Sequence, residues 1–261
     1  MSQVVYTANF NSVSLGSIDG LTVLKTDPYK PSKRTVSNQL LARSDKSTIT
    51  AGFYTERTLV VRVAISRSTR DLVEQSFDSL MSILQGFEKE LVLRQAGAAR
   101  KYICTYSDAN ILKDGGSYLE LDLIFVTSDH FGYDTSYTIL INDQQFTSSS
   151  RTDQISLAGS APWQQPIIRY TYSALTGGTS KVVTISNDAV GQTLTITRTW
   201  AAGDVLTIDP SDTDPVKVNG VKVAFTGAVP EWQVGVGSIT YSDTLTTRTV
   251  VCRMTYYKRY V

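Results

Sequence analysis

The sequence predicts a mainly β protein in two parts, an N-terminal α+β domain with one helix and a following all-β sandwich. Three observations support this prediction. Only residues 68–86 place apolar residues at the three- and four-residue spacing of an amphipathic helix. The segments around that stretch alternate apolar and polar residues with the period of two that is typical of strands. Beyond about residue 136, short strand-like runs are separated by turn residues and no helical period is found.

The helix is predicted at about residues 69–85. Its apolar face consists of Leu72, Val73, Phe77, Leu80, Met81 and Leu84. Ser68 and Asp71 form a variant of the capping box, and Gly86 can adopt the left-handed conformation that ends a helix. Because a helix with one apolar face must cover another apolar surface, we expect it to lie on a β-sheet.

The strands of the first domain, residues 1–135, are predicted from alternation. They are Val4–Phe10, Leu21–Lys25, Thr48–Phe53, Arg57–Ser66, Glu90–Arg94, Lys101–Tyr106 and Tyr118–Thr127. In the last of these, Leu119, Leu121 and Leu123 lie on one face while Glu120 and Asp122 lie on the other. The alternation stops near residues 128–137, where we place the domain boundary.

Residues 29–53 contain a segment with two possible structures. A proline-rich bend leads into a basic, polar run, Ser32–Lys46, before the strand at Thr48–Phe53. The run includes the candidate contact residues Lys33, Arg34, Leu40, Leu41 and Arg43. It forms either a hairpin that projects from the domain or an ordinary loop.

The second domain, residues 136–261, is predicted as an antiparallel sandwich because its short strands recur every eight to twelve positions. The predicted strands are Ile155–Leu157, Ile167–Tyr172, Lys181–Ser186, Thr193–Arg198, Val205–Asp209, Val216–Val218, Val221–Phe225, Ser238–Tyr241 and Arg248–Tyr256. Asn219–Gly220, between two valine-rich runs, indicates a tight hairpin.

Composition and motifs argue against several classes of protein. Lys plus Arg is 25 and Asp plus Glu is 24, which gives no broad attraction to nucleic acid or membrane surfaces. No apolar run approaches the ~20 residues of a membrane span, and the first residues lack the pattern of a secretory signal. Cys104 and Cys252 are expected to be buried free thiols.

We predict no catalytic, cofactor-binding or metal-binding residues. The single histidine, His130, has no cysteine or carboxylate cluster around it. Asp209, Asp212 and Asp214 form an acidic loop that lacks the glycine and terminal glutamate of an EF-hand, so a solvated turn is the better interpretation.

Three tryptophans lie in the second domain. Trp200 ends an alternating run and is expected in the core. Trp163 and Trp232, each near a proline, are expected to be partly exposed. They are the candidate contacts for a ligand or partner, by stacking on a sugar ring, although simple packing is the alternative that we favour.

The C-terminal part of the sequence is similar to a known family. It contains Gly203-Asp-Val-Leu-Thr-Ile-Asp209, Val218-Asn-Gly-Val-Lys-Val223, Pro230-Glu-Trp-Gln-Val-Gly-Val-Gly-Ser-Ile-Thr-Tyr241 and Met254-Thr-Tyr-Tyr-Lys-Arg-Tyr260. This succession resembles the C-terminal domain of distal tail proteins, the baseplate hubs of siphovirus-type bacteriophages. The order of elements in the first half agrees, so the resemblance covers nearly the whole chain. One departure is Gln233-Val-Gly-Val-Gly, where a Pro-Gly-Asn turn is commoner.

The resemblance implies a virion structural protein at the phage tail tip, made in the bacterial cytoplasm, with no enzymatic activity and no cofactor. It implies a homohexameric ring built by the N-terminal domains, with galectin-like sandwiches facing outward. The implied partners are the tail tube protein, the tail tip protein and a receptor-binding protein or fibre, with DNA only passing through the lumen. The segment 29–53 would then reach the next subunit.

Three other functions stay open at the level of sequence. One is a carbohydrate-binding module for host adhesion, and another is a tail-tube-type ring protein. The third is a hydrolase of cell wall or surface polysaccharide, for which the sequence supplies no evident acid–base pair.

Overall fold

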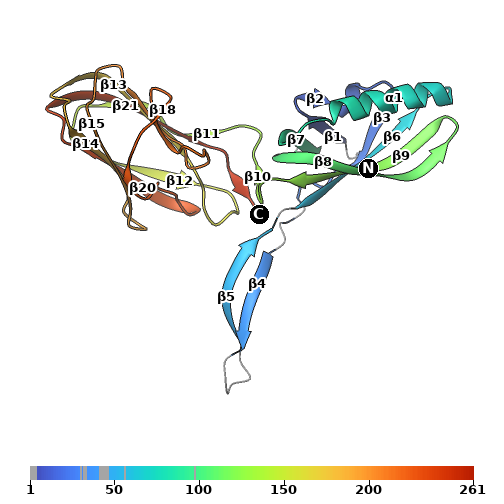
Figure 1. Cartoon of the computed structure of the whole chain (residues 1–261), viewed down its shortest axis with the longest axis horizontal. Helices are drawn as coiled ribbons and strands as arrows, with labels where there is room; N and C mark the ends of the chain where they lie inside the picture. The colour runs from blue at the N-terminus through green and yellow to red at the C-terminus, as the bar shows by residue number, and fades with distance from the viewer. Residues whose placement is uncertain (1–4, 30, 32–33, 41–46, 56, 97) are drawn as a thin grey trace. The chain divides into compact units, whose positions relative to one another are not determined.

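The computed structural model describes residues 5–29, 31, 34–40, 47–55, 57–96 and 98–261. The chain divides into two units between Thr135 and Ser136, and we describe each unit by itself. Among the described residues, the first unit holds the α-helix and the second is built of strands (Figure 1). The predicted mainly β class with one helix is therefore confirmed.

The first unit is organised around an antiparallel sheet with the strand order β2-β1-β7-β8-β9-β6-β3. Its elements are β1 (Tyr6–Phe10), β2 (Val13–Ser14), the 3-10 turn η1 (Leu15–Ser17), β3 (Leu21–Lys25), β6 (Thr58–Ser66), β7 (Lys89–Gln95), β8 (Ala98–Gly115), β9 (Tyr118–Thr127) and β10 (Gly132–Tyr133). Strands β6 and β9 pair without a register shift from Thr58 opposite Val126 to Ser66 opposite Tyr118. This uninterrupted register keeps the fully buried residues of the two strands, such as Val61 and Val63 on β6 and Leu121 on β9, on the same face.

Helix α1 (Arg70–Ile83) covers one face of this sheet, as Figure 1 shows. Its N-cap is Thr69 rather than the predicted Ser68, because Thr69 has the extended backbone of a cap and its hydroxyl accepts a hydrogen bond from the Leu72 N–H. The helix ends at Ile83, and Gly86 then takes a positive φ of 101° as the chain turns towards β7. Leu80 is among the helix residues buried against the sheet.

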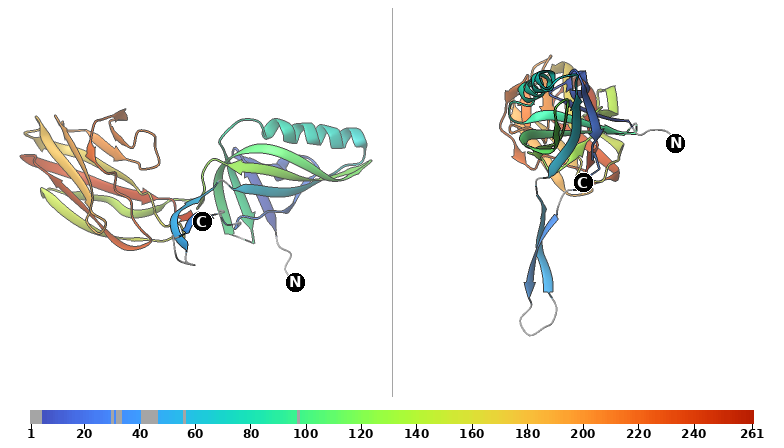
Figure 2. Two further views of the ribbon diagram at one scale, coloured as in Figure 1. Left: turned by 60° about the horizontal axis from the view of Figure 1, so that its bottom comes forward. Right: turned by 90° about the vertical axis from the view of Figure 1, so that its right-hand side faces the viewer.

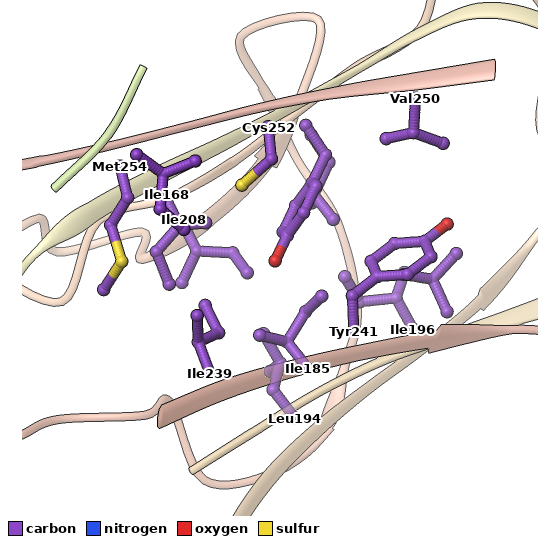
Figure 3. Packing of buried hydrophobic residues seen from close by; sticks show 14 of the residues in the cluster. Ile168, Ile185, Leu194, Ile196, Ile208, Ile239, Tyr241, Val250, Cys252 and Met254 are labelled. Atoms are coloured by element: carbon purple, nitrogen blue, oxygen red, sulfur yellow. The ribbon is translucent and has the colours of Figure 1, made fainter. Parts of the chain in front are cut away.

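The second unit is a sandwich of two antiparallel sheets, with the orders β11-β21-β13-β16-β17-β18 and β12-β20-β14-β15-β19. Its strands are β11 (Thr138–Phe146), β12 (Ser150–Leu157), β13 (Ile167–Thr176), β14 (Lys181–Asn187), β15 (Gln192–Arg198), β16 (Val205–Ile208), β17 (Val216–Val218), β18 (Val221–Lys222), β19 (Thr226–Gly227), β20 (Gly235–Asp243) and β21 (Thr247–Tyr256). The short β22 (Arg259–Tyr260) follows them and belongs to neither sheet. Figure 3 shows side chains of β21, such as Cys252 and Met254, pointing at Ile185 and Ile239 from the other sheet. The inner faces of the two sheets therefore form one core.

The predicted strands differ from the observed ones where polar residues dilute the alternation. Strand β11 was not predicted, because residues 142–145 in its second half are polar and exposed and break the alternation. The predicted strand Val221–Phe225 is shorter in the structure, where β18 ends at Lys222. The tight hairpin is confirmed, since Val218 pairs with Val221 and both Asn219 and Gly220 have positive φ.

Replacing Leu80 by alanine tests how strongly the helix is held on the sheet. Because Leu80 is fully buried, Leu80→Ala should lower the free energy of unfolding by about 2–5 kcal/mol. The neighbouring exposed Ser79 gives the control, since Ser79→Ala should change it by less than about 0.5 kcal/mol. Urea titration followed by circular dichroism measures both, and equal losses in the two variants would contradict this packing.

Candidate assembly interface

The segment with two possible structures in the sequence forms a hairpin, the β4–β5 ribbon. Strand β4 (Arg34–Leu40) pairs antiparallel with β5 (Ser47–Tyr54), and the two run side by side in Figure 1 and Figure 2. Arg34 and Leu40 are the first and last residues of β4. Three other predicted contact residues, Lys33, Leu41 and Arg43, lie outside the described residues. That this hairpin contacts another subunit stays a prediction.

The ribbon has unpaired edges on both sides. Among the described strands, β4 and β5 pair only with each other and join none of the larger sheets. Strand β3, at one end of the first unit's sheet, pairs only with β6 among the described strands, and η1 and β1 of the same unit lie beside it. Open edges offer rows of N–H and C=O groups to a strand of another chain. The ribbon is therefore the part of the first unit that is best suited to pair with a strand of another chain.

Large apolar side chains are exposed on the same unit. Phe87, in the connection between α1 and β7, is 82% exposed, and Ile111 in β8 is 59% exposed. The others are Val5, Val13, Leu24, Tyr29 and Leu112. Exposed aromatic and aliphatic side chains are the groups that release most free energy when a contact buries them.

The outward face of the first sheet carries charges that neutralise each other. Arg62 forms a two-pronged ion pair with Asp122, at 2.8 and 3.0 Å. Beside them, hydrogen bonds from Lys113 and Tyr118 lower the pKa of Glu120. A general acid needs a raised pKa, so this arrangement does not suit Glu120 to acid catalysis.

The structure corrects the expected exposure of Trp232. Its side chain is 1% exposed, and its indole N–H donates a hydrogen bond to the Ser238 carbonyl at 2.8 Å. Gly237 makes room for the ring, because a Cβ at that position would lie 3.0 Å from the indole. Trp232 is thus part of the core, whereas Trp163 is partly exposed and its contact role stays a prediction. Trp200 is buried, as expected.

The remaining candidate chemical groups have structural partners. Asp212 and Asp214 of the acidic loop form ion pairs with Lys217 and Lys222. In the described part of the chain, no group of three or more His, Cys, Asp or Glu side chains could hold a metal ion. Burial raises the pKa of each of the two buried thiols to about 12. No helix among the described residues is both long and apolar enough to span a membrane.

Comparison with known proteins gives a structural likeness and no match of sequence. No protein-family model matches the chain, and no curated protein matches it either. The fold is similar to the crystal structure of SPP1 Dit (gp 19.1), described as a paradigm of the hub adsorption apparatus in phages that infect Gram-positive bacteria. That comparison has a TM-score of 0.72 at 13% identity and covers 98% of this chain and 100% of that chain.

A second similar structure is the phage P2 baseplate in its activated conformation with Ca. Its TM-score is 0.48 at 9% identity, and the comparison covers 98% of each chain. At these identities, the likeness to SPP1 Dit shows that the two chains share a fold over nearly their whole length.

Changing the two tryptophans separately tests their different roles. Trp232→Ala should lower the free energy of unfolding by about 3–5 kcal/mol, because it opens a cavity between the sheets and removes the bond to Ser238. Trp163→Ala, at a partly exposed position, is the matched control and should cost clearly less. Urea unfolding followed by circular dichroism gives both values. Unchanged stability in Trp232→Ala would show that the buried indole is not a core residue.

Proposed function

We propose that this chain is a structural protein of a long-tailed bacteriophage, forming a ring-shaped hub at the distal end of the tail tube. The observation that carries the proposal is the shared fold with SPP1 Dit over nearly the full length of both chains. The family resemblance of the C-terminal sequence, found independently of the structure, supports it. The hub would lie in the virion, at the tail tip.

Ring formation from identical copies requires two different surfaces on each copy. The β4–β5 ribbon is one such surface, because its strands have no further partner among the described strands, and the exposed apolar side chains of the body would form the other. We propose that the ribbon of one copy contacts the body of the next and that this series of contacts closes into a ring after six copies. Exposed side chains such as Phe87 would be buried in these contacts.

The proposed partners follow from the two units. The first unit would join the tail tube protein and leave a lumen through which DNA passes. The near-equal numbers of acidic and basic residues suit a wall that does not grip phosphates. The second unit, with its own hydrophobic core, would serve as the docking platform for the tail tip protein and a receptor-binding protein or fibre.

Removing the ribbon's basic segment tests the ring. Deletion of residues 32–46 should leave a folded chain, because the described buried cluster of the first unit is supplied by residues 8–21 and 59–125, on either side of the deletion. It should also abolish the hexamer, since the contact with the neighbouring copy is lost. Light scattering after size exclusion measures the mass, and circular dichroism verifies the fold. A hexamer formed by the deletion variant would contradict the assigned contact.

A second candidate function is the binding of neutral polysaccharide by the second unit. The outward face of β12, β20, β14 and β15 consists mostly of hydroxyl side chains, among them Thr152, Thr240, Thr184, Thr193, Thr195 and Thr197. Thr152 and Thr240 are hydrogen-bonded across the strands at 2.9 Å. Such hydroxyls suit a polyhydroxylated ligand, because they can donate and accept hydrogen bonds. The Asp188 carboxylate, which accepts hydrogen bonds from Thr240 and Ser186, supplies a further acceptor and disfavours an anionic ligand.

An added charge on this face distinguishes the two functions. Thr152→Asp should reduce retention of the full chain on purified bacterial cell walls, because a carboxylate desolvated against a neutral sugar is unfavourable. Ser173→Asp, on an exposed position of the other sheet, should leave retention unchanged. If the chain is not retained, or both variants bind as well as the parent, this candidate function is excluded.

A further inference from the structure

The chain segments that precede and follow the β4–β5 ribbon meet at one buried side chain. Pro28 lies on the segment that enters the ribbon and Arg57 on the segment that leaves it. Tyr102, on β8, contacts both of them. These residues are 74 and 45 positions apart from Tyr102, so only the folded sheet brings them together.

The contact is made by the phenol group from two directions. The Tyr102 hydroxyl donates a hydrogen bond to the Pro28 carbonyl and accepts one from Arg57 Nη1 at 3.4 Å. The guanidinium carbon of Arg57 also lies 5.3 Å from the centroid of the Tyr102 ring, as in a cation–π contact. Burial raises the pKa of Tyr102, so its hydroxyl keeps the proton that it donates.

Arg57 ties the exit of the ribbon to a second point on the body. Its Nη2 donates to the His130 carbonyl at 2.8 Å, and its backbone N–H donates to the Thr127 hydroxyl at 3.0 Å. The Thr127 N–H in turn donates to the Arg57 carbonyl at 3.0 Å. Arg57 is 4% exposed, and a charge buried this deeply is held in place by its partners.

Gly132 shows how closely the chain approaches this group. A Cβ at Gly132 would lie 2.8 Å from a ring carbon of Tyr102, closer than side-chain carbons approach. Strand β10 therefore passes directly against the tyrosine ring. The ring is enclosed while its hydroxyl is directed at the entrance of the ribbon.

We propose that Tyr102 is a positioning residue that joins both roots of the β4–β5 ribbon to the sheet and so sets the direction in which the ribbon is presented to a second copy. This inference rests on the proposed ring. A two-stranded ribbon is marginally stable alone, and the pairing of its two strands does not fix its orientation relative to the sheet. A fixed root reduces the conformational entropy that assembly must otherwise remove.

Because the ribbon is long, a small rotation where it joins the sheet moves its far end by a large distance. At 3.3 Å per residue, the seven residues of β4 extend about 23 Å, so a rotation of about 20° at the root would move the far end by about 8 Å. Such a displacement exceeds the spacing of paired strands, about 4.8 Å, and would move the ribbon off a partner edge.

Tyr102→Phe tests the proposal because it removes the hydroxyl and keeps the ring. Nitroxide labels are attached to Ser37→Cys in β4 and Ser79→Cys in α1, in the full chain held as monomer by dilution, where the native Cys104 and Cys252 are buried. Double electron–electron resonance should give one narrow distance in the parent and lose it to a broad distribution in Tyr102→Phe. Light scattering at high concentration should show loss of the ring.

Tyr106→Phe is the matched control. Tyr106 lies on the same strand, and its hydroxyl contacts Met81 Sδ at 3.7 Å instead of the ribbon. This variant should keep the narrow distance and the ring. If Tyr102→Phe does not fold, Arg57→Lys takes its place, because a lysine keeps the charge but lacks the forked group that reaches Tyr102 and His130 together.

The outcomes separate this inference from the proposed ring. A narrow distance in folded Tyr102→Phe or Arg57→Lys overturns the positioning role, whether or not a ring forms. Broadening in Tyr102→Phe but not in Tyr106→Phe supports it. If the parent never forms a ring, the proposed function fails, while the distance measurement still decides what Tyr102 does. Equal broadening in both variants shows a general loosening of β8 and also overturns the inference.

Discussion

Unpaired backbone groups at strand edges are the constraint that shapes this protein. A strand inside a sheet forms backbone hydrogen bonds with a neighbour on each side. Among the described elements, β4 and β5 pair only with each other, so each strand of the ribbon has one side without a strand partner. Water satisfies such an edge in the isolated chain, but a second chain can replace that water with a ladder of hydrogen bonds. The same property that favours ring formation also favours uncontrolled pairing. The register shift between Ser37 and Asn38 limits this risk, because an irregular strand matches fewer partners.

Each of the two units has its own hydrophobic core. In the first, the long ladder of β6 and β9 and the helix above it bury one continuous apolar face, which gives the ribbon a rigid base. In the second, the core lies between two sheets, and the outward faces are left to polar side chains. The threonine-rich face of the second unit points away from the core, so contacts there can change without loss of the fold.

Trp232 shows why the exposure of a single aromatic residue is hard to predict. Its neighbouring proline and glycines indicate a surface turn, and turns usually place side chains near solvent. In the folded unit the glycines have the opposite effect, because Gly237 leaves the space that the indole fills. Trp232 can enter the core because Gly237, five positions away, has no side chain to occupy that space.

The sequence by itself determined the elements whose signal is local. Periods of two and of about 3.6 residues located β6, β9 and α1 within a few positions, and Asn219–Gly220 identified a two-residue turn because few other pairs accept positive φ at both positions. The tertiary structure alone decided that Thr69 caps the helix, that Trp232 is buried, and that Pro28, Arg57 and Tyr102 meet. The physical reason is that the period of a strand states which face a residue occupies, whereas sheet register and packing decide which distant residue it finds there.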